Sequence, residues 1–155
     1  MAPPLLVFDR GLARRRLARV AASGMAADFL LARAIEDFGE RLATIKRAFS
    51  CVLDAGTPSP GLAAWLADRI HPRPLVRLAP ILETTGDEPV LRIVGDEENL
   101  PLAQESFELA VTAFSLQNLN DLPGALIQLR RVLKPDGLFL GCLLGGTSQI
   151  GRAHV

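Results

Sequence analysis

The sequence has few of the residues that build metal clusters and disulfide frameworks. Its 155 residues include only two cysteines and two histidines. That is too few for an ordinary structural zinc site, so no metal centre is expected. Cys51 and Cys142 each lie in an apolar stretch, which predicts two buried, unreactive thiols in a reducing compartment.

The chain also lacks a long apolar run and an excess of charge of one sign. No run approaches the ~20 residues of a membrane span, and the amino end lacks the layout of a secretory signal. These features favour a cytoplasmic protein over the lesser alternative, an arginine-rich organelle presequence. The 17 basic side chains balance the 17 acidic ones, which argues against nucleic acid as a partner.

The positive charges are nevertheless unevenly placed, because five arginines crowd the amino end. They are Arg10, Arg14, Arg15, Arg16 and Arg19. A cluster of this kind is more often a solvated helix face than an anion site, and a solvated face is the expectation here.

Apolar runs alternate with helical patterns along the rest of the chain. Strands are predicted at residues 49–53, 75–78, 90–94, 107–114 and 138–144. Helices are predicted from the following patterns: residues 11–22; a stripe of Leu30, Ala34, Phe38, Leu42, Ile45 and Phe49; Leu62, Leu66 and Ile70; and Leu126, Leu129 and Leu133. Residues 120–123 are expected to cap the last helix, and residues 134–137 to form a turn.

This alternation predicts a doubly wound α/β domain with a mostly parallel sheet covered on both faces. We expect an N-terminal helical segment at residues 1–48, whose two helices pack on an edge of the sheet or cover it as a lid. Residues 49–147 would form the core. The final residues, Ile-Gly-Arg-Ala-His-Val, resemble a translated sequencing adapter. We therefore expect a non-native tail at 148–155, a truncated core and an exposed apolar fifth strand.

The core is organised around the stretch FSCVLDAGTPSPG, residues 49–61. An apolar run leads into Asp54, and Ala55-Gly56 then begins a small-residue turn ahead of a helix. In open α/β sheets such turns lie at the carboxyl ends of the strands, where ligands bind. The stretch therefore predicts a ligand-facing turn.

Four further motifs lie between residues 94 and 146: D-E-E-x-L-P, S-F-E-L, N-D-L-P-G-A-L and L-K-P-D-G-L-F. With them the chain resembles, from about residue 8 to 147, the class I S-adenosylmethionine-dependent methyltransferases. Within that family it is similar to the branch that contains the biotin-pathway malonyl-carrier-protein methyltransferase and the assembly-factor-5-like proteins of respiratory complex I.

The resemblance implies an incomplete Rossmann-like methyltransferase fold that binds S-adenosylmethionine. Asp54, Ala55 and Gly56 would hold the methionine end of the cofactor, with Gly56 letting the backbone come close. Asp96 would accept from the adenine amino group, and a backbone N–H beside it, at Glu97, would read the ring. The carboxylates of Glu97 and Glu98 are expected to point outward. Ser115, after the fourth strand, lies where cofactor and acceptor would meet.

Three departures from the family pattern stand at the same positions. Pro58 and Pro60 replace glycines of the first turn, which removes backbone donors. Arg77 matches the acid that grips the ribose hydroxyls, a task for which a guanidinium has no acceptor; Glu83 is one substitute, and a preference for an anionic ligand is another reading. Gln117-Asn118 replace His-Trp, so no catalytic residue is assigned. His71 is expected to be solvated.

The resemblance implies a methyltransferase acting on a small molecule or a carrier-bound acid. The alternative is a complex I assembly factor that hydroxylates a protein arginine or chaperones a respiratory subunit. A third interpretation is a non-catalytic interaction module on the same fold, favoured by Pro58, Pro60 and Arg77.

Overall fold

The computed structural model describes residues 6–23, 28–83 and 89–145. The suspected tail at 148–155 lies outside these ranges. The described elements are four α-helices, one 3₁₀ turn and five strands. In chain order they are α1 (Arg10–Ser23), α2 (Phe29–Ala43), β1 (Val52–Ala55), α3 (Gly61–Ile70), β2 (Leu75–Ala79), β3 (Val90–Val94), β4 (Phe107–Ala113), η1 (Leu116–Asn118), α4 (Leu122–Val132) and β5 (Leu133–Cys142).

The five described strands form one sheet in the order β3-β2-β1-β4-β5, and every neighbouring pair is parallel. Because β1 lies between β2 and β4, the order reverses at β1, which is the arrangement of a doubly wound sheet. All the carboxyl ends therefore lie at one edge. The predicted fold class, a doubly wound α/β domain with a parallel sheet, is confirmed.

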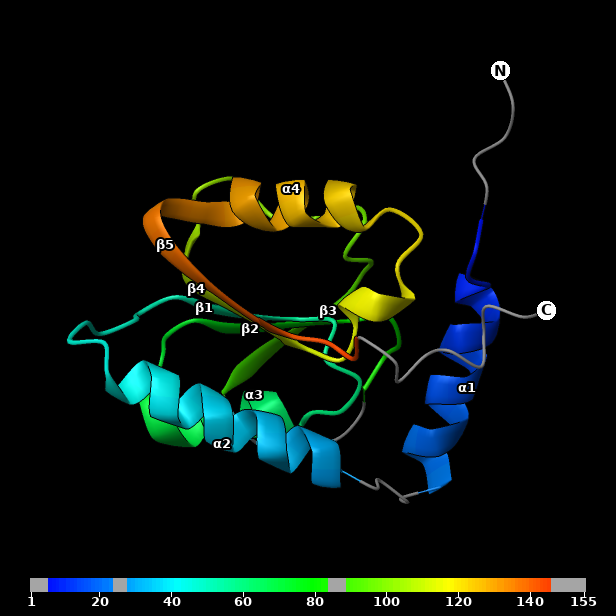
Figure 1. The fold of residues 1–155 in the computed structure, drawn as a ribbon, viewed down its shortest axis with the longest axis horizontal. Helices are drawn as coiled ribbons and strands as arrows, with labels where there is room; N and C mark the ends of the chain where they lie inside the picture. Colours follow the sequence, from blue (N-terminus) through cyan, green and yellow to red (C-terminus); the bar gives the residue numbers. More distant parts are fainter. Residues whose placement is uncertain (1–5, 24–27, 84–88, 146–155) are drawn as a thin grey trace.

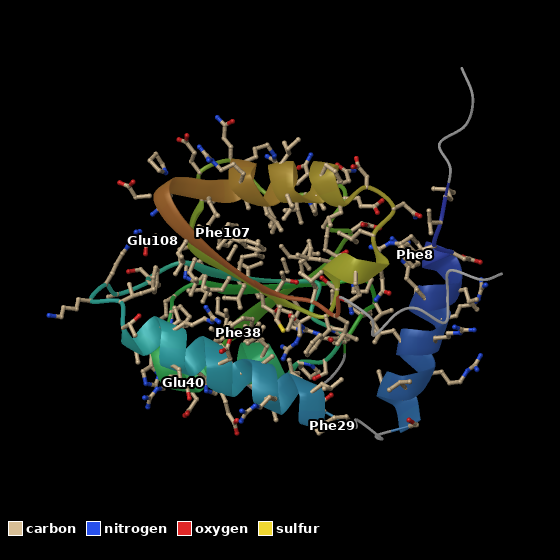
Figure 2. All side chains as sticks on the ribbon, in the orientation of Figure 1. Phe8, Phe29, Phe38, Glu40, Phe107 and Glu108 are labelled. Carbon is tan, nitrogen blue, oxygen red and sulfur yellow. The ribbon has the colours of Figure 1, made fainter. Side chains whose placement is uncertain are left out.

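Helices cover both faces of the sheet (Figure 1), with α4 on one face and α2 and α3 on the other. Alternate residues of β1 serve the two sides: Val52 packs in the cluster of α2 and α3, and Leu53 in the cluster of α4. Figure 2 shows Phe38 of α2 and Phe107 of β4 on opposite sides of the sheet. Both clusters pack on the same sheet, one on each face, so together they form a single core.

The two N-terminal helices occupy different places, one beside the sheet and one over a face of it (Figure 1). Helix α1 stands beside the sheet rather than on a face (Figure 1), and none of its residues is buried. Helix α2 instead packs on the face beside α3, burying Leu31, Ala34 and Phe38. Helix α2 therefore covers the sheet, one of the two predicted placements, because its apolar stripe needs the sheet as a partner.

Helix α2 runs without a break through Gly39 but ends at Ala43, so Ile45 and Phe49 are not on its stripe. Leu31 rather than Leu30 is its first buried leucine, because Leu30 is 43% exposed. Helix α4 shows the same displacement. Its buried stripe is Ala125, Leu129 and Val132, whereas Leu126 is exposed and Leu133 belongs to β5.

The ends of two strands also differ from the predicted ones. Strand β1 begins at Val52 and includes Asp54 and Ala55, so these residues lie within the ladder rather than after it. Strand β5 begins at Leu133, and the predicted turn at 134–137 lies inside it. The turn survives as a bulge, because Phe107 pairs with Leu133 and Leu109 with Leu138.

Strand β5 lies at one edge of the described sheet, as the sequence predicted.

The thiols of Cys51 and Cys142 are half-buried rather than fully buried, and burial raises the pKa of both. Asp121 caps α4 as expected, with its Oδ1 accepting from the Gly124 N–H at 2.8 Å. Within the described ranges, no helix combines the length and the apolar character that crossing a membrane would need.

The displaced stripe of α4 gives a direct test of the packing. Leu129→Ala, which empties a buried position on α4, is expected to lower the free energy of unfolding by about 2–5 kcal/mol. The matched change Leu126→Ala removes the same atoms from an exposed position and should cost about 0.5 kcal/mol or less. Urea unfolding of the two variants measures both. Equal losses would contradict the described face of α4.

Candidate functional site

The turns after β1 and β3 are aligned at the carboxyl edge by two backbone hydrogen bonds. The Gly56 N–H donates to the Leu78 carbonyl at 2.8 Å, and the Gly95 N–H donates to the Ala79 carbonyl at 3.0 Å. Gly56 has a φ of 74°, a conformation in which glycine carries no steric penalty. A Cβ added there would clash with the Glu97 carboxylate. The positive φ and this close approach together favour glycine at the point where the two turns meet.

A cavity of about 310 Å³ opens at this edge, between the strand ends and α1. Its size is at the lower end of the range for ligand pockets. One wall is α1, and the floor comes from the turns after β1, β2, β3 and β4. The lining residues are Arg10, Ala13, Arg14, Arg16, Leu17, Val20, Gly56, Pro58, Pro80, Glu97, Phe114, Ser115 and Asn118.

Two acids after β3 hold the arginines of α1. Arg10 Nη2 lies 2.9 Å from Asp96 Oδ1 and 2.8 Å from Glu97 Oε2, and Arg14 Nη2 lies 2.8 Å from Asp96 Oδ2. Burial raises the pKa of Asp96, but the Glu98 N–H and the two guanidinium groups outweigh it and hold the pKa below its usual range. The arginine cluster is thus only in part a solvated face.

The carboxylates of Glu97 and Glu98 point inward, and the expectation that they face outward is wrong. Glu97 is 2% exposed and lies against the backbone of Gly56. Glu98 Oε1 accepts from the backbone N–H groups of Asn120 and Asp121. Both carboxylates turn in because Arg10 and the unpaired N–H groups before α4 offer donors that a buried acid needs.

Beneath the rim, Asp54, Arg77 and Glu83 form a buried ionic triad. Arg77 Nη1 donates to Asp54 Oδ2 at 2.6 Å, and its Nη2 and Nε donate to Glu83 Oε1 and Oε2 at 2.6 and 2.7 Å. Arg77 Nη2 also donates to the Thr57 carbonyl at 2.9 Å. Arg77 thereby braces the turn after β1 from below.

The charges of this triad perturb one another. Burial raises the pKa of Asp54 even though the Arg77 guanidinium opposes it. Burial alone would lower the pKa of Arg77, but Glu83 and Asp54 raise it overall. Asp54 Oδ1 is buried and has no hydrogen-bond partner among the described residues. A donor bound at that oxygen would complete the site.

Arg77 does not lie at the rim, which corrects the predicted match to the ribose-binding acid. It is the third of five residues in β2, opposite Asp54 in the register, and 1% exposed. The rim after β2 is formed by Ala79 and Pro80, and Pro80 lines the cavity. Neither has a carboxylate. Glu83 does not substitute, because both of its oxygens are taken by Arg77.

The end of β4 carries a strained residue. Phe114 has a φ of 58°, a region that bulky residues rarely adopt and that often marks functional sites. Ser115 follows it, buried, with its hydroxyl 2.9 Å from Thr112 Oγ1. Gln117 turns its amide back to the Phe114 carbonyl at 3.0 Å. His71 lies exposed at the end of α3, as expected.

The structure therefore brings together part of the predicted site. Gly56, Glu97 and Ser115 line the cavity, and Asp96 does not line it but pairs with Arg10 and Arg14, which do. Asp54 is buried under the turn, and Ala55 is fully buried within β1. The sequence reasoning missed the cavity wall on α1, although the arginine cluster was the signal that marked it.

The chain matches the family model described as "Methyltransferase domain" over residues 53–141, which is more than half of its length. The chain belongs to the class I S-adenosylmethionine-dependent methyltransferases. The matched region runs from β1 to β5 and so includes the turns after β1, β2, β3 and β4. Helix α1, which forms the outer wall of the cavity, lies outside it.

This methyltransferase-family chain is similar to two relatives whose names give a specific activity. It is 33% identical over 148 residues to the mitochondrial arginine-hydroxylase NDUFAF5 of Danio rerio, covering 90% of this chain and 46% of the relative. It is 33% identical over 153 residues to the malonyl-[acyl-carrier protein] O-methyltransferase of Methylovorus sp. (strain MP688), covering 90% and 52%. The chain spans about half the length of the curated relatives it matches.

Solved structures share the fold of this methyltransferase-family chain. A methyltransferase in complex with the Haloferax volcanii Trm112 activator superposes with a TM-score of 0.67 at 23% identity, over 79% of this chain and 57% of that one. An S-adenosyl-L-methionine-dependent methyltransferase structure from Methanococcus maripaludis gives 0.61 at 17% identity, over 99% and 73%. The [4+2]-cyclase SpnF gives 0.58 at 21%, over 70% and 43%.

Removing the cation from the buried triad should be costly. Arg77→Met leaves Asp54 and Glu83 facing each other without a partner, and we expect a loss of about 3–5 kcal/mol in the free energy of unfolding at pH 7. Urea unfolding gives the value. The control Arg41→Met breaks the exposed pair with Asp37 and should leave the urea midpoint nearly unchanged.

The same variant should show a distinctive pH dependence. Without Arg77, no guanidinium opposes the effect of burial on Asp54, so the pKa of that carboxyl rises further and the folded state binds more protons than the unfolded state. Stability of the variant then rises as the pH falls from 7 toward the unfolded carboxyl pKa values near ~4. Its deficit relative to the wild type should therefore shrink over that window. A deficit that stays constant down to pH 5 would show that the lost stability is steric rather than electrostatic.

Proposed function

We propose that this chain binds S-adenosylmethionine in the cavity at the carboxyl edge and contributes to transferring its methyl group to a small molecule or a carrier-bound acid. One observation carries the proposal. The glycine turn after β1 and Glu97 after β3 meet in the lining of a single cavity, at the point where the sheet order reverses.

The residues present fit the cofactor in part. Asp54, the acid proposed for the ammonium of the methionine end, is buried beneath the turn and does not line the cavity. Asp96, which binds two arginines of the cavity wall, is suited to the adenine amino group. Gly56 and Ala55 offer backbone, and Glu97 and Ser115 offer polar groups at the cavity wall. The ribose-binding position, after β2, has no carboxylate, which favours weak binding.

When bound, the cofactor supplies a sulfonium-activated methyl group. The task left to the chain is to hold the acceptor in line with that methyl. Phe114 and Ser115 lie at the floor of the cavity, where an acceptor would rest. Glu97 is the only carboxylate among the described residues that line the cavity, and it is occupied by Arg10. We therefore assign positioning rather than proton removal to this part of the protein.

A second candidate is protein-arginine hydroxylation, the activity printed in the name of the Danio rerio relative. A specific observation favours it. The guanidinium of Arg10 is held by Asp96 and Glu97 and lies 3.4 Å from the Asn118 carbonyl, so the rim already binds an arginine side chain. Methyl transfer to a carboxylate, against an oxygen-dependent gain in mass on a protein arginine, distinguishes the two candidates.

Isothermal calorimetry tests the proposal. S-adenosylmethionine is expected to bind, and Asp96→Asn should weaken binding by about 10- to 100-fold, because it removes a charge-assisted hydrogen bond. The control Asp68→Asn changes an exposed acid on α3, away from the cavity, and should bind as the wild type does. Absence of heat with the wild-type chain would contradict the proposal and favour an interaction module without cofactor.

A further inference from the structure

Helix α1 is held to the rest of the molecule mainly through polar contacts near its start. The Asn120 side chain accepts from the Phe8 N–H at 2.8 Å and donates to the Phe8 carbonyl at 3.1 Å. Figure 2 labels Phe8 just ahead of the helix. Arg10 and Arg14 then reach the acids after β3. No residue of α1 is buried, so apolar packing adds little to its attachment.

The remainder of the helix covers the cavity. Arg16, Leu17 and Val20 follow the two anchoring arginines and line the same cavity as Gly56 and Ser115. Val20 is 51% exposed even so. The helix is therefore a wall that rests on the opening of the cavity and is fastened at one end.

The groups that fasten α1 are the groups a ligand would need. Asp96 Oδ1 accepts from Arg10 and from the Glu98 N–H, and Oδ2 accepts from Arg14. The Glu97 carboxylate, bound to Arg10, lies where a ligand would approach the Gly56 backbone. A ligand that reaches either point must take the place of an arginine or move Glu97.

We propose that α1 is a strap that closes the cavity, and that Arg10 competes with the bound ligand for the carboxylates of Asp96 and Glu97. The identity of the ligand rests on the proposed function, but the attachment of α1 to the acids after β3 does not. Arg10 and Arg14 are partly exposed, with 19% and 46% of their side chains accessible, so salt screens their ion pairs. Thermal fluctuations are then sufficient to detach α1 from the acids after β3.

Hydrogen exchange of the α1 amides tests the fastening without any ligand. Arg10→Gln should speed exchange along α1 by about two- to tenfold, the range expected for losing two partly exposed ion pairs, and added NaCl should have the same effect on the wild type. Arg15→Gln is the matched control, because Arg15 is an exposed neighbour on the same helix outside the cavity lining. Equal exchange in both variants would overturn the strap.

Binding of S-adenosylhomocysteine tests the competition. If Arg10 competes, Arg10→Gln binds this probe about two- to tenfold more tightly than the wild type, and the probe speeds exchange of α1 in the wild type. Weaker binding by the variant, or slower exchange of α1 on adding the probe, would show that Arg10 supports the ligand and would overturn the competition.

The two measurements separate this inference from the function on which its ligand rests. If neither the wild type nor Arg10→Gln binds S-adenosylhomocysteine, the proposed function fails, and competition for that ligand fails with it. Faster α1 exchange in Arg10→Gln would still support the strap in that case. If Arg10→Gln exchanges its α1 amides at the wild-type rate and both proteins bind S-adenosylhomocysteine normally, the proposed function stands and the strap is rejected.

Discussion

The parallel ladder between β1 and its two neighbours is the constraint from which the site follows. It aligns Asp54 with Arg77 on one side and with Val111 on the other. The ladder continues one residue beyond β1, where the Gly56 N–H reaches the Leu78 carbonyl. Because all described strands run the same way, every turn that follows a strand opens on the same edge. A nucleoside-sized cavity at that edge is a consequence of the topology rather than of any one side chain.

Two groups of ion pairs determine the electrostatics of this edge. Two arginines are each shared between two acids, one buried within the sheet and one at the mouth of the cavity. In the buried triad, the Arg77 guanidinium opposes burial, which raises the pKa of Asp54. At the mouth, Arg10 draws Glu97 over the glycine turn. Both arrangements place a guanidinium beside an acid that the family resemblance assigns to the cofactor. Binding of the proposed cofactor would therefore be linked to these internal ion pairs.

The likeness to known proteins limits how far function follows from fold. The chain shares its fold with methyltransferases and with a [4+2]-cyclase, and its named relatives include a hydroxylase and a carrier-protein methyltransferase. One fold thus accompanies several chemistries, so the fold alone does not decide the reaction. In this chain, the departures at Pro58, Pro60 and Gln117 lie at or next to the carboxyl edge.

Most of the strands were predictable from the sequence, because buried parallel strands are short, apolar and bounded by turn residues. Residues 90–94 were predicted without error, and 75–78 and 107–114 to within one residue of the structure. Helix faces were less well predicted. Leu126 and Leu30 fit an apolar period, yet Ala125 and Leu31 are buried in their place. Period alone does not fix which of two adjacent positions faces the sheet.

By itself, the sequence determined the order of strands and helices, the family, and the glycine and acids of the rim, since these depend on local residue types and spacing. Only the tertiary structure decided the partners of the charges. Arg10 lies 86 residues from Asp96, and Arg77 lies 23 from Asp54. A long side chain selects its partner after the backbone has brought distant segments together. That choice depends on burial and on competing donors, and neither is written in the spacing of the residues.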